Sequence, residues 1–183
     1  TYYENNSLVF GGYAIFTCRH DYYDGYWYSA ITSNETNGNA LRCKSADGII
    51  WEIVGTFPGK AQYEEQIAFV GNDLYAVVRT DTKIYKSTDV GSTWTEYMTV
   101  TAFQTRPQLI GYKDSLLSII PLTSNVDGYY GPSGRNTIGF NIDTGEKLKI
   151  GSRYGIVYPS VFVVYHDVFI IFSNNMLFRK YIA

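Results

Sequence analysis

The chain has 183 residues, 45% of them hydrophobic, and a formal net charge of -2 from 15 Lys and Arg against 17 Asp and Glu. This length allows one domain or a piece of a larger one, and the hydrophobic content argues against a disordered chain. A near-neutral charge without a basic stripe argues against nucleic acid as the main partner, and no apolar run approaches the roughly 20 residues of a membrane helix.

The counts of individual residue types narrow the classes further. With 2 His and 2 Cys, neither a His-built metal site nor a disulfide scaffold is expected, and we expect no cofactor. The unusual count is 18 Tyr, a residue that favours strands and offers a stacking surface for sugars. The first residues, Thr1-Tyr2-Tyr3-Glu4, resemble neither a start nor a signal peptide, so we expect an excised or processed piece.

Short β-branched and aromatic runs separated by Gly, Asn and Asp recur along the chain, and no segment shows a helical period. The predicted strands are 8–10, 13–18 and 40–44, then 67–70, 74–79 and 83–87, then 108–112, 115–120 and 137–141, and finally 160–165, 168–172 and 176–181. Repeats of roughly 40–50 residues with three or four antiparallel strands are typical of propeller blades. We therefore predict an all-β fold, a single partial β-propeller over 1–183, with about four blades at 1–57, 58–101, 102–150 and 151–183.

One motif recurs at the spacing of these units. Ser87-Thr88-Asp89-Val90-Gly91-Ser92-Thr93-Trp94 fits S-x-D-x-G-x-T-W, and Ser45-Ala46-Asp47-Gly48-Ile49-Ile50-Trp51 is the same pattern shortened by one residue. A degraded copy follows at residues 141–146. Such a segment predicts a hairpin turn in which the Asp carboxylate accepts backbone N–H groups, the Gly has positive φ and the Trp packs beneath.

These motifs resemble the Asp boxes, or BNR repeats, of the sialidase superfamily, where they are structural and close the outer two strands of each blade. In this comparison the chain resembles the C-terminal two-thirds of a six-bladed sialidase domain. Ser87, Asp89, Gly91 and Trp94, with Asp47 and Trp51, would then be the structural Asp-box residues.

Three further stretches resemble the active-site blades of that family. Glu64 and Arg79 flank a strand pair that is similar to the segment with a catalytic Glu and the second Arg of the triad. Arg135 resembles the third triad Arg, and Tyr158 resembles the nucleophilic Tyr. The family's first Arg and its general-acid Asp have no counterpart here, so sialidase activity depends on their presence elsewhere in the full protein.

The resemblance implies that these residues have different roles in a central pocket. Arg79 and Arg135 would bind the sugar carboxylate, Tyr158 would attack the anomeric carbon, and Glu64 would be its base. A neutral nucleophile suits an anionic substrate, because a carboxylate would be repelled. Glu65 competes for the role of base, and arginines that only pair with surface acids remain the simpler alternative.

The alternation of strand direction gives an independent test of this site. It predicts that Glu64, Arg79, Arg135 and Tyr158 lie at one end of their sheets, opposite the motif turns, together with Arg19 and Arg106. The loops expected at 20–39 and 122–134 would lie at the same end, and Tyr26 and Trp27 of the first loop are further candidate sugar-binding residues. Cys18 and Cys43 lie on strands expected to be neighbours, which allows either a disulfide or two buried thiols.

The leading functional hypothesis is recognition, and in a complete protein hydrolysis, of terminal sialic-acid-type glycans. The alternative is a non-catalytic glycan- or receptor-binding propeller of a phage tail or a cell-surface protein, and a structural propeller without a sugar site is a third reading. The expected partners are a glycan and a second chain that completes the propeller. The expected location is extracellular or surface-exposed.

Overall fold

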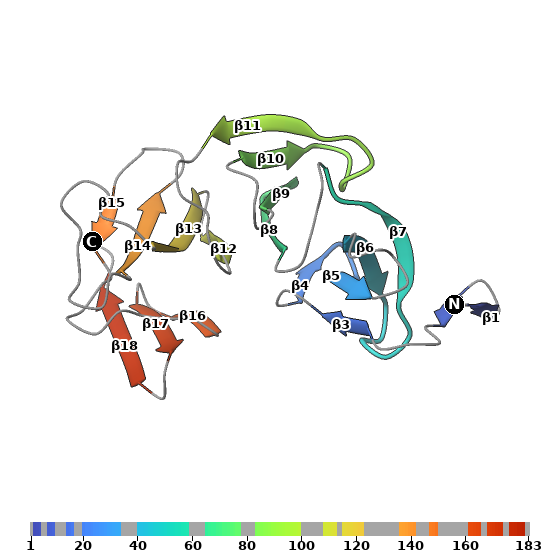
Figure 1. Ribbon diagram of the computed structural model, residues 1–183, viewed down its shortest axis with the longest axis horizontal. Helices are drawn as coiled ribbons and strands as arrows, with labels where there is room; N and C mark the ends of the chain where they lie inside the picture. Colours follow the sequence, from blue (N-terminus) through green and yellow to red (C-terminus); the bar gives the residue numbers. More distant parts are fainter. Residues whose placement is uncertain are drawn as a thin grey trace. The chain divides into compact units, whose positions relative to one another are not determined.

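The computed structural model describes residues 2–4, 7–9, 14–16, 20–33, 40–58, 65–77, 83–99, 108–112, 115–122, 136–141, 147–149, 161–165, 168–173 and 176–181. These segments are β-strands with their connecting turns, and none of them is helical (Figure 1). No helix in the described segments is therefore long and apolar enough to cross a membrane. The all-β fold class is as predicted.

The strands form a short hairpin and four antiparallel sheets. The hairpin is β1 (Tyr2–Glu4) with β2 (Ser7–Val9), and the first sheet has β3 (Ala14–Phe16), β4 (Asp21–Tyr23), β5 (Tyr26–Ser33), β6 (Ala40–Ser45) and β7 (Glu52–Thr56). The second sheet has β8 (Gln66–Val70), β9 (Asp73–Val77), β10 (Lys83–Ser87) and β11 (Thr95–Thr99). The third has β12 (Gln108–Tyr112), β13 (Ser115–Leu122), β14 (Asn136–Asn141) and β15 (Lys147–Lys149), and the fourth has β16 (Val161–Tyr165), β17 (Val168–Ser173) and β18 (Met176–Tyr181).

The chain divides into two compact units, residues 1–101 with β1 to β11 and residues 102–183 with β12 to β18. Within the second, third and fourth sheets the strands lie side by side in the order of the sequence, which is the meander of a propeller blade. Each of the four sheets also falls within one of the four segments expected to form blades.

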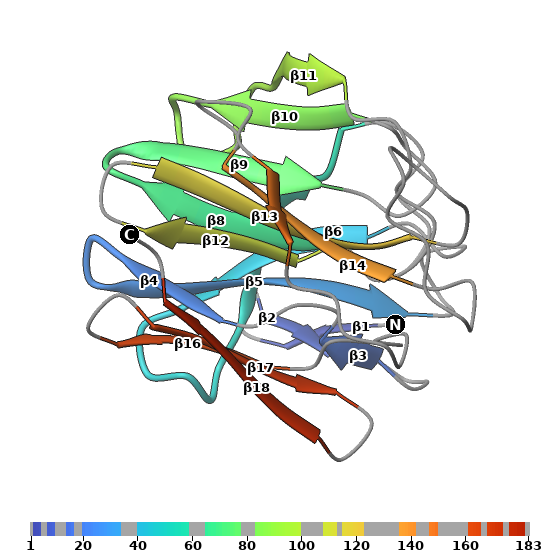
Figure 2. The ribbon, with the colours of Figure 1, turned by 90° about the vertical axis from the view of Figure 1, so that its left-hand side faces the viewer.

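The first sheet differs from its prediction. Residues 20–33, expected to begin a long loop, contain β4 and the whole of β5, and both β3 and β4 pair with β5. The reason is a two-residue turn at Asp24 and Gly25, whose φ angles of 47° and 83° are those of a type I′ hairpin. The aromatic residues on both sides of this turn are good strand formers. Figure 2 shows the hairpin edge-on, with its turn at the left.

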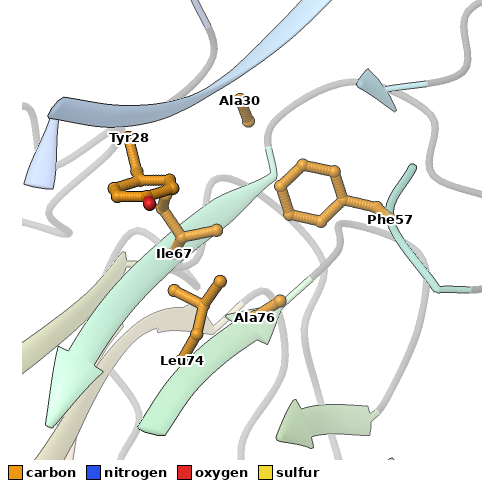
Figure 3. Close-up of a cluster of buried hydrophobic side chains, with 6 residues drawn as sticks. All are labelled: Tyr28, Ala30, Phe57, Ile67, Leu74 and Ala76. Carbon is orange, nitrogen blue, oxygen red and sulfur yellow. The ribbon is translucent and has the colours of Figure 1, made fainter. Parts of the chain in front are cut away.

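The core of the first unit lies between its first and second sheets (Figure 3). Its buried side chains come from β5, β8, β9 and the segment after β7, and they are Tyr28, Ala30, Phe57, Ile67, Leu74 and Ala76. Side chains two positions apart on a strand point to the same face, which places Tyr28 and Ala30 together on β5. Ile67 and Leu74 have no exposed surface, and each contributes about 1.5–3 kcal/mol through burial.

The turn of residues 45–51, called the 45–51 turn below, joins β6 to β7 and is organised by one carboxylate. Asp47 Oδ1 accepts the backbone N–H groups of Ile49 at 2.8 Å and Ile50 at 2.9 Å. Ser45 Oγ donates to the same oxygen at 3.0 Å and accepts the N–H of Gly48 at 2.9 Å. The bonds from Ile50 and Ile49 hold the pKa of Asp47 below its ordinary value.

The 87–94 turn joins β10 to β11 and repeats this arrangement. Ser87 Oγ donates to Asp89 Oδ1 at 2.6 Å and accepts the N–H of Gly91 at 2.6 Å. Thr93 donates its backbone N–H to Asp89 Oδ1 at 2.8 Å and its hydroxyl to Oδ2 at 2.7 Å. Together the bonds from Ser87 and Thr93 hold the pKa of Asp89 far below its ordinary value. The predicted carboxylate geometry is present in both turns, and the glycines at 48 and 91 have positive φ.

The tryptophans that end the two turns occupy different surroundings. Trp94 is half-buried, and its ring stacks on Phe57 of the core region with ring centroids 6.2 Å apart. Trp51 lies beside His20 at 4.9 Å, and its Nε1 donates to the carbonyl of Gly48 at 3.1 Å. The 87–94 turn is therefore packed onto the core, whereas the tryptophan of the 45–51 turn closes its own loop.

A buried arginine of β6 lies beneath the 87–94 turn. Arg42 is 2% exposed, and its Nη2 donates to the carbonyl of Val54 at 2.7 Å. A Cβ at Gly91 would lie 2.0 Å from Arg42 Nη1 and 2.9 Å from Trp94 Cζ2, and one at Gly55 would lie 2.8 Å from Nη2. The guanidinium therefore fills the space that side chains at both glycines would need. Burial lowers the pKa of Arg42, which nevertheless remains protonated at neutral pH.

This contact predicts different costs for two substitutions at the same backbone conformation. Gly25 and Gly91 both have φ of 83°, but only Gly91 has atoms near its missing side chain. We expect Gly25→Ala to cost about 1–2 kcal/mol through backbone strain. Gly91→Ala should cost about 1–3 kcal/mol more, because the methyl group overlaps a guanidinium that is tied to Val54. Urea unfolding of both variants measures the difference, and equal losses would contradict the packing described.

The carboxylate bonds of the 87–94 turn predict a dependence of stability on pH. The folded pKa of Asp89 lies below the ordinary 3.8, so its contribution is present above that pH and is lost as the pH falls towards the folded value. We expect the urea midpoint of the native chain to fall between about pH 5 and pH 3. Asp89→Asn should flatten this fall, whereas Asp24→Asn, in a turn without such bonds, should leave it unchanged. Parallel slopes for all three proteins would be inconsistent with this role.

Candidate functional site

The charged residues and the nucleophilic tyrosine assigned to the predicted pocket lie outside the described residues. This holds for Glu64, Arg79, Arg135, Tyr158 and Arg19, so their roles stay predictions. What the structure does describe are the strands that lead to most of them, and the registers of these strands show at which end of each sheet the chain enters and leaves.

In the second sheet, β8 begins and β9 ends at the same end of the sheet. Gln66 opens β8 and pairs with Val77, which closes β9. The 87–94 turn is at the opposite end, where β10 finishes beside the start of β9. Glu64 precedes the first of these residues by two positions and Arg79 follows the second by two. The chain segments with these two residues therefore join the sheet at its end away from the turn.

The third and fourth sheets have comparable strand starts. Asn136, the residue after Arg135, opens β14 and pairs with Leu122 at the end of β13. Tyr158 lies three positions before Val161, the first residue of β16. Arg135 and Tyr158 themselves lie outside the described residues, so the end of the sheet at which they lie stays a prediction.

A buried carboxylate marks the same end of the second sheet. Glu65 immediately precedes β8 and has no exposed surface, and Gln66 beside it is 2% exposed. Ionisable groups withdrawn from water are rare and are often functional. Of the two neighbouring glutamates considered as the base, Glu65 is the one whose burial the structure describes.

The aromatic residues proposed for the pocket lie at the opposite end. Trp27 pairs with Ser45, where β6 ends and the 45–51 turn begins, and Tyr26 is the residue before it. The prediction that Tyr26 and Trp27 share an end with the pocket residues was therefore wrong. Its physical cause is the two-residue turn at Asp24-Gly25, which makes the segment a hairpin whose tip points to the side of the 45–51 turn.

Two rings of this hairpin form an exposed pair. Tyr22 on β4 is the cross-strand partner of Trp27 on β5. Their ring centroids are 4.9 Å apart at an interplanar angle of 61°, an edge-to-face arrangement. The two residues are 56% and 40% exposed. Two exposed rings in contact form a small apolar surface that a ligand could cover.

The other face of the hairpin, opposite Tyr22 and Trp27, has a charged pair. Lys44 Nζ lies 4.5 Å from the ring centroid of Tyr26 and 3.0 Å from Glu52 Oε1. The hydrogen bond to Glu52 raises the pKa of Lys44, which therefore carries a full charge at neutral pH. Because both ends of the ion pair are accessible to water, it adds little stability.

The hairpin is fixed to the second sheet by three contacts. Tyr23 stacks on Phe69 with centroids 4.4 Å apart and planes at 8°, and its hydroxyl donates to Asn72 Oδ1 at 3.1 Å. Asp21 Oδ2 accepts the backbone N–H of Phe69 at 2.9 Å. These contacts span nearly fifty positions in sequence, so the exposed pair stands on a rigid support.

Two further expectations concern cysteine and metal. Cys43 is a buried thiol that donates to the carbonyl of Ser29 at 3.4 Å, and Cys18 lies outside the described residues. In the part of the chain that the structure describes, no group of three or more His, Cys, Asp and Glu could hold a metal ion.

Comparison with known proteins identifies the fold. No protein-family model matches the chain, and no curated protein matches its sequence. The solved structure of YjhT is similar with a TM-score of 0.55 and 12% identity, over 83% of this chain and 56% of YjhT. The GH43 endo-arabinanase from Bacillus licheniformis has a TM-score of 0.47 and 11% identity, over 88% of this chain and 70% of its own.

The chain thus spans little more than half the length of YjhT, which is a β-propeller. At this level of identity the likeness concerns the fold alone. Together with the successive four-stranded meanders, it shows that the chain is part of a β-propeller.

Proposed function

We propose that this chain is the glycan-recognising part of a sialidase-like propeller that acts on terminal sialic-acid-type sugars. The observation that carries the proposal is the register of the second sheet, in which Gln66 at the start of β8 pairs with Val77 at the end of β9. Glu64 and Arg79 lie two positions beyond these residues in the sequence. The carboxylate-centred turns, which resemble Asp boxes, and the propeller fold support it.

In this proposal the cationic side chains bind and the phenol reacts. Arg79 and Arg135 would each donate paired hydrogen bonds to the sugar carboxylate, a geometry that guanidinium groups match closely. The Tyr158 oxygen would attack the anomeric carbon while Glu64 accepts its proton, which retains the anomeric configuration after hydrolysis. The general acid for the leaving oxygen would come from elsewhere in the complete protein.

A second candidate function is attachment without hydrolysis, as in a receptor-binding propeller of a phage tail or a cell-surface protein. The exposed pair of Tyr22 and Trp27 favours it, because it needs no catalytic residue. Both candidates place the protein outside the cell or on a virion, and both allow a further chain to complete the propeller.

A glycan array probed with the native chain and two arginine variants tests the carboxylate clamp. Arg135→Ala should weaken binding to sialylated glycans by about ten-fold or more, since a charge-assisted hydrogen bond contributes about 1.5–3 kcal/mol. Arg135→Lys should recover only part of the loss, because an ammonium cannot form the paired bonds. Arg179→Ala is the matched control, since Arg179 lies within β18 and pairs with Ile170 rather than at a strand end.

Two outcomes would count against the clamp. Equal losses in Arg135→Ala and Arg179→Ala would indicate a nonspecific effect of charge. Binding confined to uncharged glycans, unchanged by Arg135→Ala, would move recognition away from the proposed pocket and leave the attachment function in its place.

A further inference from the structure

We propose that Tyr22 and Trp27 form a separate carbohydrate-binding site, for an uncharged sugar ring, at the end of the first sheet that has the 45–51 turn. This inference extends the proposed recognition of glycans but does not depend on the carboxylate clamp, because it uses neither Arg79 nor Arg135. The site, called the hairpin platform below, consists of the two exposed rings and their polar atoms.

The polar atoms of the hairpin platform are unused. Within the described residues, neither the Tyr22 hydroxyl nor the Trp27 indole N–H has a hydrogen-bond partner. Neighbouring aromatic residues differ in this respect, since Trp51 donates to the carbonyl of Gly48 and Tyr23 donates to Asn72. The platform therefore offers two apolar rings, the Trp27 indole N–H as a hydrogen-bond donor, and the Tyr22 hydroxyl as both a donor and an acceptor. A sugar presents the complementary combination of a C–H face and hydroxyl groups.

The charge around the platform selects an uncharged ligand. Cross-strand partners share a sheet face, so Tyr22 and Trp27 lie with Ser45 on one face of the first sheet. The nearest ion pair joins Lys44 and Glu52. Lys44 is the residue before Ser45 on β6, so its side chain belongs to the other face of the sheet. Among the described residues of the first sheet, a sugar carboxylate would thus find neither Lys nor Arg on this face. The ligand class differs from that proposed for the pocket.

The size of the platform favours a sugar over a protein partner. Two partly exposed aromatic rings offer on the order of 200 Å² in total. A stable protein interface buries about 800 Å² on each partner. One sugar ring stacked on Trp27, with Tyr22 as a side wall, uses the whole platform.

The platform is also held rigid before any ligand binds. The type I′ turn fixes the hairpin, and Tyr23 and Asp21 attach it to Phe69 of the second sheet. Little conformational entropy is therefore lost when a sugar stacks on the rings, which favours binding by a small ligand.

Saturation-transfer NMR with uncharged oligosaccharides tests the proposal. The probes are trisaccharides that end in glucose, galactose, mannose or N-acetylglucosamine. We expect at least one to receive magnetisation on its C–H face, and Trp27→Ala to weaken its binding by about ten-fold. Tyr22→Ser, which removes the side wall but leaves the stacking surface of Trp27, should weaken it less, and thermal unfolding shows whether each variant is folded.

Matched controls separate this site from the pocket and from general effects. Tyr97→Ala removes a ring that is 38% exposed on β11 of the second sheet, and it should not change binding of the trisaccharide. Arg135→Ala should also leave it unchanged, so failure of the carboxylate clamp would not affect this result. Absence of binding by all four trisaccharides, or equal binding by the native chain and Trp27→Ala, would overturn the proposal.

A protein interface is the remaining rival, because Ile49 and Ile50 in the 45–51 turn are also exposed. Analytical ultracentrifugation of the native chain and of Ile49→Ser and Trp27→Ala distinguishes it. Concentration-dependent association that both substitutions abolish would assign the surface to a second copy of the chain and overturn the sugar site. A monomer in all three samples is the expected result.

Discussion

Two side chains of the first sheet reach across to the second, and the arrangement of the first unit depends on them. Arg42 fills the space beneath Gly91, and Asp21 binds the backbone N–H of Phe69. Between these contacts lies the apolar core. Because a propeller blade packs only on its neighbours, such cross-sheet contacts decide how one blade is placed against the next. The two turns and the aromatic hairpin take their positions from this packing.

The features that the sequence predicted well are those governed by local interactions. A serine two residues before an aspartate, with a glycine one or two residues after it, is enough to specify the carboxylate geometry at Asp47 and Asp89, since all the bonded groups lie within a few residues. Three strands of the second sheet, β8 to β10, followed from short apolar runs between turn residues, whereas the more polar β11 was not predicted. The pocket residues could be predicted only as strand-end positions, and their side chains remain predictions.

The features that the sequence could not specify depend on distant partners. Aromatic residues at 22–28 suit either a binding loop or a strand pair, and only the Asp24-Gly25 turn distinguishes the two. The Asp24-Gly25 pair is visible in the sequence, but the many tyrosines around it are equally typical of a binding loop. The burial of Arg42 has no local signature at all, because the residues that enclose it include Gly91 of the next sheet. Charged residues on strands are ordinarily exposed.

The bond between Asp21 and Phe69 has a consequence for the association of chains. β8 is the last strand on its side of the second sheet, where backbone N–H and C=O groups could template an additional strand from another molecule. The Asp21 carboxylate accepts the N–H of Phe69, and the Tyr23 ring stacks on the side chain of the same residue. Because a neighbouring element covers this edge, strand addition is hindered there, so the same contact that orients the hairpin also protects the β8 edge of the second sheet against edge-to-edge aggregation.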